Sequence, residues 1–212
     1  MQELICFDMD NTLVYANKLH IIAYNRAFIK NGLPPVNEEK LKSLFGIIGY
    51  KLIKILFPKL KIKDAKKIQK DHNKIAVKLA EKYIKPVKGA KTALKKLRKK
   101  YILALITNCS KEEVNAILKA AGIEKNIFKV IVSNEMTKRP KPAPDPVIYV
   151  IKKVGVKKGY MVGDTIYDIK AGKKAGLKTI GLLTGNQPEK ILKKEKPNII
   201  LKSVAELPKY LC

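Results

Sequence analysis

The second half of this chain alternates short, continuously apolar runs with helix-like segments, and no other feature constrains the fold as strongly. Apolar runs without polar alternation are typical of strands that are buried on both faces. Such runs occur at residues 4–7, 101–106, 130–132, 160–162, 179–183 and 198–201, and helical patterns lie between most of them, at 91–100, 111–121, 145–154 and 169–175. The alternation predicts an α/β fold with a doubly wound parallel sheet.

Helical patterns alone fill the chain between the first strand and the rest. They cover residues 17–31, 37–57 and 64–84, with an interruption at Gly46 to Gly49 in the second. We therefore expect an inserted all-helical domain at residues 16–85, and a sheet domain built from residues 1–15 and 86–212.

The formal net charge of +27 raises the question of nucleic-acid binding. Only three of the 45 basic residues are arginines, the side chain that best reads phosphates and base edges, and the lysines are spread over nearly every predicted helix. We interpret this Lys- and Ile-rich composition as a thermophile surface. We therefore do not expect nucleic acid as a partner, and keep a Lys-rich nucleic-acid-binding protein as an alternative function.

Location is constrained by three observations. No apolar run is long enough to cross a membrane, and the first residues carry no basic segment of a signal peptide. The three cysteines, Cys6, Cys109 and Cys212, form no metal-binding spacing. We expect a reduced, cytoplasmic protein with no membrane partner.

Polar side chains gather where four of the predicted strands end. They are Asp8 and Asp10 after the first strand, Thr107 and Asn108 after the second, Lys141 in the proline-rich loop after the third, and Asp164 and Asp168 after the fourth. Ligands of doubly wound sheets bind at the carboxyl ends of the strands, so these side chains are candidates for one site.

Phosphoryl transfer suits these residue types. The Asp8 carboxylate can attack phosphorus, and Asp10 can protonate the leaving oxygen and then activate water. Thr107, the amide of Asn108 and the cation of Lys141 can hold the phosphoryl oxygens.

Attack by a carboxylate on an anionic phosphate also requires charge neutralisation. Mg2+ prefers oxygen ligands, which Asp8 and Asp164 can supply. Asp168 is a further ligand, directly or through water, and the backbone carbonyl of Asp10 is another.

Four segments in order resemble the motifs of the haloacid dehalogenase superfamily. They are Asp8-Met9-Asp10-Asn11-Thr12, Leu105-Ile106-Thr107-Asn108, Lys141-Pro142-Ala143-Pro144-Asp145 and Gly163-Asp164-Thr165-Ile166-Tyr167-Asp168. The helical insertion resembles the cap of the phosphoglycolate phosphatase-like and β-phosphoglucomutase-like branch. One departure is Arg139-Pro140 before the lysine, where relatives often have a small residue.

The resemblance implies a Rossmann-like core with a helical cap, and a Mg2+-dependent phosphatase. Its substrate would be a small phosphorylated metabolite, phosphoglycolate-like, hydrolysed through an aspartyl phosphate on Asp8. A sugar phosphomutase like β-phosphoglucomutase is the alternative. We expect a monomer or a homodimer.

Other polar residues have simpler interpretations. Ser110 is expected to cap a helix, and Cys109 to be a buried thiol. His20 and His72 have no histidine or cysteine at ligand spacing, so we expect each to be an ordinary surface or core-edge histidine. The Gly46 to Gly49 interruption is either a loop facing the active site or a bend between helices.

Overall fold

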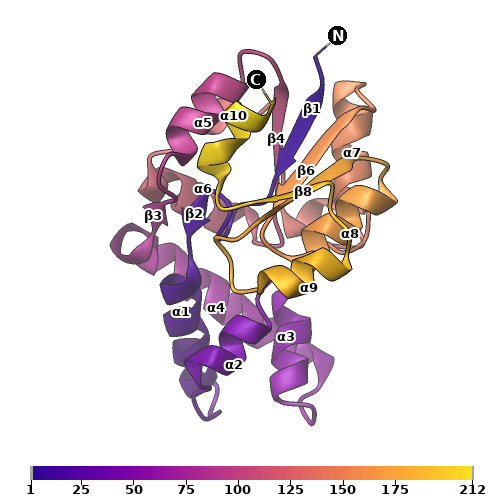
Figure 1. The fold of residues 1–212 in the computed structure, drawn as a ribbon. Coiled ribbons are helices and arrows are strands. Elements are labelled where there is room, and N and C mark those ends of the chain that lie inside the picture. The colour runs from indigo at the N-terminus through magenta and orange to yellow at the C-terminus, as the bar shows by residue number, and fades with distance from the viewer. Residues whose placement is uncertain (1, 212) are drawn as a thin grey trace.

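A computed structural model describes residues 2–211 of the chain, so Cys212 lies outside the described residues (Figure 1). Six parallel strands form the central sheet in the order β5-β4-β1-β6-β7-β8. They are β1 (Leu4–Phe7), β4 (Ile102–Ile106), β5 (Val130–Val132), β6 (Gly159–Gly163), β7 (Lys178–Leu182) and β8 (Ile199–Leu201). The predicted α/β fold with a doubly wound parallel sheet is confirmed.

Helices cover both faces of this sheet. They are α5 (Ala90–Leu97), α6 (Lys111–Ala121) and α10 (Leu207–Leu211) on one face, and α7 (Asp145–Val154) and α8 (Ile166–Lys174) on the other. Alternate residues of β1 separate the two layers, because Ile5 and Phe7 join the first core whereas Leu4 and Cys6 join the second. This two-sided burial explains the unbroken apolar runs of the sequence.

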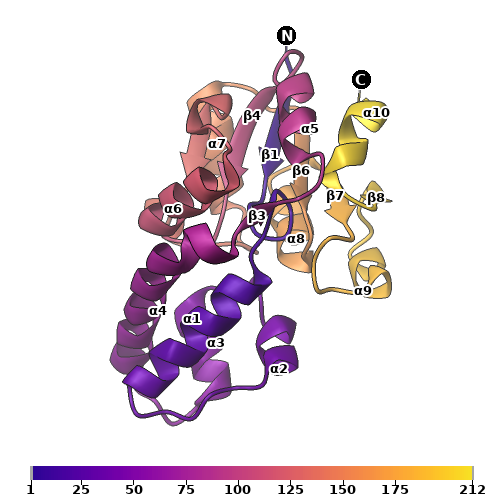
Figure 2. The same cartoon turned by 90° about the vertical axis from the view of Figure 1, so that its left-hand side faces the viewer.

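Four helices lie together at one end of the molecule, beyond the carboxyl ends of the strands (Figures 1 and 2). They are α1 (Asn17–Lys30), α2 (Glu38–Ser43), α3 (Gly49–Leu56) and α4 (Ile62–Tyr83), and we call them the cap. The cap has an apolar core of its own around Phe28, Leu52 and Ile68, while α4 also packs against α6. The division at residues 15/16 and 85/86 stays a prediction.

Some short elements were not predicted from the sequence. β2 (Val14–Tyr15) pairs antiparallel with β3 (Lys85–Pro86) at the two chain crossings into the cap, and α9 (Glu189–Lys194) lies before β8. Three short 3-10 segments occur at Lys125–Ile127, Asn134–Met136 and Val204–Glu206. β2 and β3 have two residues each and α9 is less than two turns long, so none of them shows the continuous apolar run or the helical period that revealed the other elements. No helix among the described residues is long and apolar enough to span a bilayer.

Candidate active site

Asp8 begins the site one residue after β1 ends. Its backbone N–H donates to the carbonyl of Val162 at 2.9 Å, which extends the β1–β6 pairing by one residue and fixes where the side chain leaves the sheet. The carboxylate is 8% exposed and meets the ammonium of Lys141, with Oδ1 and Nζ 2.5 Å apart. The predicted nucleophile is therefore held by backbone pairing and by a buried cation.

Lys141 connects two carboxylates across the site. Its Nζ donates to Asp8 at 2.5 Å, to Asp168 at 2.6 Å and to the carbonyl of Ile106 at 3.1 Å. Burial alone would lower the pKa of Lys141, but the charges of Asp168 and Asp8 outweigh burial and raise it. The lysine thus stays charged.

Crowded carboxylates mark this as a place for a cation. Oxygens of Asp8, Asp164 and Asp168 lie within 4.8 Å of one another. Burial, countered by Lys141 and reinforced by the neighbouring acids, raises the pKa of Asp8 to about 7. Burial and the charges of Asp8 and Asp168 raise the pKa of Asp164 well above its ordinary value. A divalent cation with oxygen ligands would relieve this repulsion, so the three acids fit Mg2+.

The two acids of the fourth motif, Asp164 and Asp168, differ in their hydrogen-bond partners. Both oxygens of Asp168 are engaged, Oδ1 by Lys141 and Oδ2 by the backbone N–H and hydroxyl of Thr165. Asp168 also packs against Gly163, where an added Cβ would come within 2.3 Å of its carboxyl carbon. Asp164 accepts a bond from the hydroxyl of Thr12 at 3.3 Å. Asp164 is therefore the better candidate for a direct metal ligand, while the contacts of Asp168 place it to orient Lys141.

The second motif supplies donors at the start of α6. The Thr107 hydroxyl accepts from the backbone N–H of Cys109 at 3.1 Å, and the Asn108 side chain donates to the carbonyls of Gly46 at 2.9 Å and Lys141 at 3.3 Å. Ser110 caps α6 in a capping box, as predicted. Thr107 and Asn108 therefore lie at the same strand edge as Asp8, as the sequence suggested, although no bond from them to the nucleophile occurs among the described contacts.

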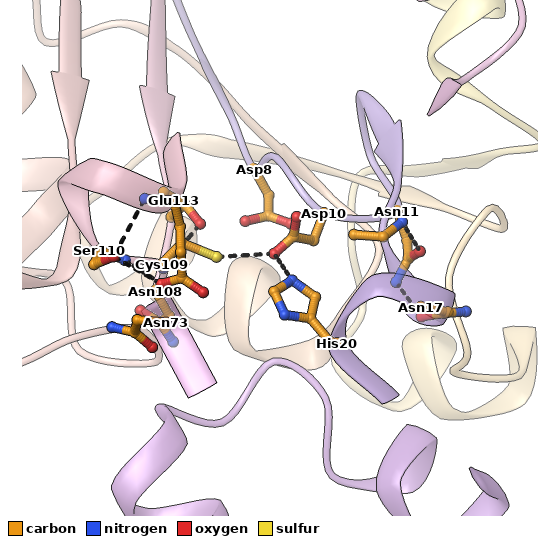
Figure 3. Close-up of polar contacts among 12 residues, drawn as sticks. Asp8, Asp10, Asn11, Asn17, His20, Asn73, Asn108, Cys109, Ser110 and Glu113 are labelled. Atoms are coloured by element: carbon orange, nitrogen blue, oxygen red, sulfur yellow. Dashed lines mark hydrogen bonds and ion pairs between the residues drawn. The ribbon is translucent and has the colours of Figure 1, made fainter. Parts of the chain in front are cut away.

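Asp10 reaches a histidine of the cap (Figure 3). Its Oδ2 is 3.2 Å from Nε2 of His20 and accepts from the thiol of Cys109 at 3.0 Å, while its Oδ1 is buried without a hydrogen-bond partner in residues 2–211. Burial alone would raise the pKa of Asp10, but the charge and hydrogen bond of His20 outweigh it and lower that pKa. Burial alone would lower the pKa of His20, but the charge and hydrogen bond of Asp10 outweigh burial and raise that pKa.

A second buried histidine continues this polar chain. Nδ1 of His20 lies 3.1 Å from Nε2 of His72, and Nδ1 of His72 lies 3.6 Å from Oε1 of Glu113 on α6. Burial and the charge of His20 lower the pKa of His72 to about 3, so its imidazole is neutral. The aromatic ring of Tyr24 stacks on His72, with the ring centroids 3.9 Å apart.

The expectation of two ordinary, unrelated histidines is wrong. His72 is flanked by Ile68 and Ala76, each four residues away on the buried face of α4, and that helical spacing was the available signal. His20 lies between Leu19 and Ala23 on the buried face of α1. A polar residue on an apolar helix face needs a buried partner, and here each histidine is the partner of the other.

The Gly46 to Gly49 interruption lies against the site rather than forming a mere bend. The carbonyl of Gly46 accepts from Asn108, and a Cβ on Gly46 would come within 2.7 Å of the ring of Tyr167. Gly46 also has a φ of 95°, which favours glycine. Arg139, by contrast, pairs with Asp145 at 3.0 Å and adds no cation to the site.

These residues enclose a cavity of about 90 Å³ between the strand ends and the cap. All seven predicted site residues line it: Asp8, Asp10, Thr107, Asn108, Lys141, Asp164 and Asp168. The cap adds aromatic and amide side chains. Near its rim, Asn17 of the cap exchanges hydrogen bonds with Asn186 of the core and accepts from Asn11 (Figure 3). The sequence-predicted residues are thus brought together, while their individual roles stay predictions.

Comparison with known proteins agrees with this architecture. The chain is 27% identical to the pyrophosphatase PpaX of Bacillus pumilus, covering 96% of this chain and 93% of that protein, and 27% identical to the phosphoglycolate phosphatase of Pasteurella multocida, covering 97% and 96%. A crystal structure described as a predicted phosphoglycolate phosphatase from Haemophilus somnus superposes with a TM-score of 0.86 at 25% identity, covering 100% of this chain and 98% of that one. The sequence profile of the haloacid dehalogenase-like hydrolases matches residues 5–182. The chain therefore belongs to the haloacid dehalogenase-like hydrolase family, as its four motifs suggested.

Proposed function

We propose that this hydrolase is a Mg2+-dependent phosphatase that cleaves small phosphomonoesters through an aspartyl phosphate on Asp8. The observation that carries the proposal is the meeting of Asp8, Lys141 and Asp164 in one cavity, since a nucleophile, a fixed cation and a metal-binding acid are what phosphoryl transfer between anions requires. The relatives named as phosphatases support the same chemistry.

The metal would be held by Asp8 and Asp164, with Asp168 acting through water because Lys141 and Thr165 already occupy its oxygens. The backbone carbonyl of Asp10 remains the further proposed ligand. When bound, Mg2+ supplies positive charge that offsets the phosphate and the crowded acids.

The chain's own residues account for the remaining steps. Asp8 attacks phosphorus, and Lys141 holds the carboxylate in place and offsets the charge of the phosphoryl oxygens. Asp10 first gives a proton to the leaving oxygen and later takes one from water. His20, which shares a hydrogen bond with Asp10, is placed to position that carboxylate.

The test is hydrolysis of p-nitrophenyl phosphate by the wild type and by Asp8→Asn, with Mg2+ or with EDTA. We expect turnover only in the wild type with Mg2+, and an acid-stable, hydroxylamine-sensitive phosphoprotein after rapid quenching. Near-normal turnover of Asp8→Asn would refute the nucleophile. With β-glucose 1-phosphate and a bisphosphate primer, isomerisation without phosphate release would instead favour the phosphomutase alternative.

A further inference from the structure

The part of the cavity that faces the phosphoryl site from the cap has a distinctive composition. We call it the leaving-group wall, because a phosphate bound at the strand ends directs the rest of its ester toward the cap. Its side chains are apolar, aromatic or amide: Tyr24, Phe45, Ile47, Leu52, Gln69 and Asn73. Tyr24 and Gln69 come together over Gly49, where an added Cβ would lie 2.9 Å from the tyrosine hydroxyl and 3.0 Å from Cγ of Gln69.

Positive charge is scarce in this cavity despite the basic chain. Lys141 is the one lysine or arginine among its lining residues, and both Asp8 and Asp168 already engage it. His72 is neutral, with a pKa lowered to about 3 by burial and by His20, and His20 is paired with Asp10. The wall therefore offers no cation to a second anionic group.

A buried acid, Glu113 of α6, lines the same cavity and supplies no positive charge. The carboxyl group of Glu113 is 2% exposed, and its Oε1 accepts no hydrogen bond among residues 2–211. An anion moved from water into such a cavity loses its hydration and gains no cation to pair with, which is costly. A hydroxyl group costs less to bury, because its oxygen can accept from the side-chain NH2 groups of Gln69 and Asn73, whose oxygens already face the backbone N–H of Tyr50 and Nδ1 of His72.

The lysines outside the cavity do not change this balance. They give the chain its net charge of +27 and attract phosphate esters generally. Such attraction between exposed charges is screened over about 8 Å at physiological ionic strength. It acts outside the cavity, and supplies no partner to a charged leaving group inside it.

Resting on the phosphatase function proposed above, we propose that the leaving group is an uncharged, hydroxyl-bearing alcohol, small enough for a cavity of about 90 Å³. The substrates are then esters of the glycol or glycerol phosphate type. A carboxylate, as in phosphoglycolate, or a second phosphate, as in pyrophosphate, meets a wall without a cation, in a cavity that Glu113 also lines. A preference for uncharged leaving groups differs from the phosphoglycolate and pyrophosphate substrates that the names of the relatives and the sequence resemblance suggest.

Two matched pairs of substrates test the proposal with the wild-type enzyme and Mg2+. One pair is 2-hydroxyethyl phosphate and phosphoglycolate, and the other is glycerol 1-phosphate and 3-phosphoglycerate; within each pair a CH2OH group replaces a carboxylate. We expect kcat/KM to be higher for the uncharged member by at least about tenfold in both pairs, and pyrophosphate to resemble the carboxylates.

A charge added to the wall should reverse the preference. Gln69→Lys places an ammonium beside Tyr24, and Gln69→Met is its control, since it removes the same hydrogen bond to the backbone N–H of Tyr50 without adding charge. We expect Gln69→Lys to shift the ratio of kcat/KM toward phosphoglycolate by at least about tenfold, and Gln69→Met to leave that ratio within about threefold.

The outcomes separate this proposal from the function on which it rests. Turnover of p-nitrophenyl phosphate with equal or greater kcat/KM for phosphoglycolate than for 2-hydroxyethyl phosphate would overturn the uncharged leaving group alone. Equal shifts of the ratio in Gln69→Lys and Gln69→Met would also overturn it. Failure to hydrolyse p-nitrophenyl phosphate and all four esters would overturn both proposals.

Discussion

Replacing the nucleophile by its neutral isostere should make the metal-free protein more stable. The pKa of Asp8 rises from its ordinary 3.8 to about 7, chiefly through burial. Each pKa unit corresponds to about 1.4 kcal/mol, so ionised Asp8 reduces the free energy of unfolding by about 4 kcal/mol. Asn retains an oxygen that can accept from Lys141. We therefore expect Asp8→Asn to gain about 2–4 kcal/mol at pH 8 in EDTA.

The pH dependence of this gain follows from the direction of the pKa change. Below about pH 4 the Asp8 carboxyl is protonated in both the folded and the unfolded chain, and it costs nothing. Between pH 4 and 7 the unfolded chain loses the proton while the folded protein keeps it, so wild-type stability falls as the pH rises. The difference between Asp8→Asn and wild type should grow over this range and level off above pH 7.

Thermal unfolding from pH 4 to 8 measures the effect. A gain of 2–4 kcal/mol corresponds to a rise in Tm of about 5–15 °C for a chain of this length. Glu124→Gln removes an exposed carboxylate and should follow the wild type. Saturating Mg2+ should narrow the gap, because Asp8→Asn lacks one proposed ligand. A gain of equal size at pH 4 and pH 8, or a less stable variant at pH 8, would refute the reasoning.

Three further substitutions test other contacts. Asp10→Asn should slow p-nitrophenyl phosphate turnover by about 10²- to 10⁴-fold while a Mg2+-induced rise in Tm persists; a variant with more than a tenth of wild-type turnover contradicts acid–base catalysis by Asp10. Lys141→Met should abolish turnover and lower stability by about 3–5 kcal/mol in urea unfolding, because Asp8 and Asp168 lose their shared cation; an unchanged urea midpoint contradicts that. Gly46→Val should lower kcat/KM by about 10- to 100-fold through its clash with Tyr167, and an unchanged value would show that the cap loop does not position the substrate.

The part of the site carried by strand ends could be predicted because it depends on local sequence. An apolar run followed at once by Asp8, or by Thr107, places that side chain at the end of a strand. Parallel pairing then brings neighbouring ends together without further information, and β1 lies between β4 and β6 as that logic requires. Lys141 is the harder case, since it lies nine residues beyond β5, and the proline-rich loop that returns it to Asp8 has no periodic pattern.

The contribution of the cap could not be predicted in the same way. His20 and His72 are 52 residues apart, on two helices whose contact depends on their axial register and rotation. A shift of one residue along α4 would turn His72 by about 100° away from His20. Sequence periodicity identifies the buried face of each helix, but the pairing of particular residues across two such faces is set by packing.

The polar chain from Asp10 to Glu113 crosses between core and cap twice, and this has a mechanical consequence. Asp10 and Glu113 belong to the strand-end region and to α6, whereas His20 and His72 belong to α1 and α4 of the cap. Displacement of the cap would separate His20 from Asp10, and the buried carboxylate would lose the charge and hydrogen bond that lower its pKa. The pKa of the proposed acid–base residue is therefore lowered by His20 only when the cap is seated over the cavity. The same movement that admits a substrate would change the pKa of the group that later exchanges a proton with it.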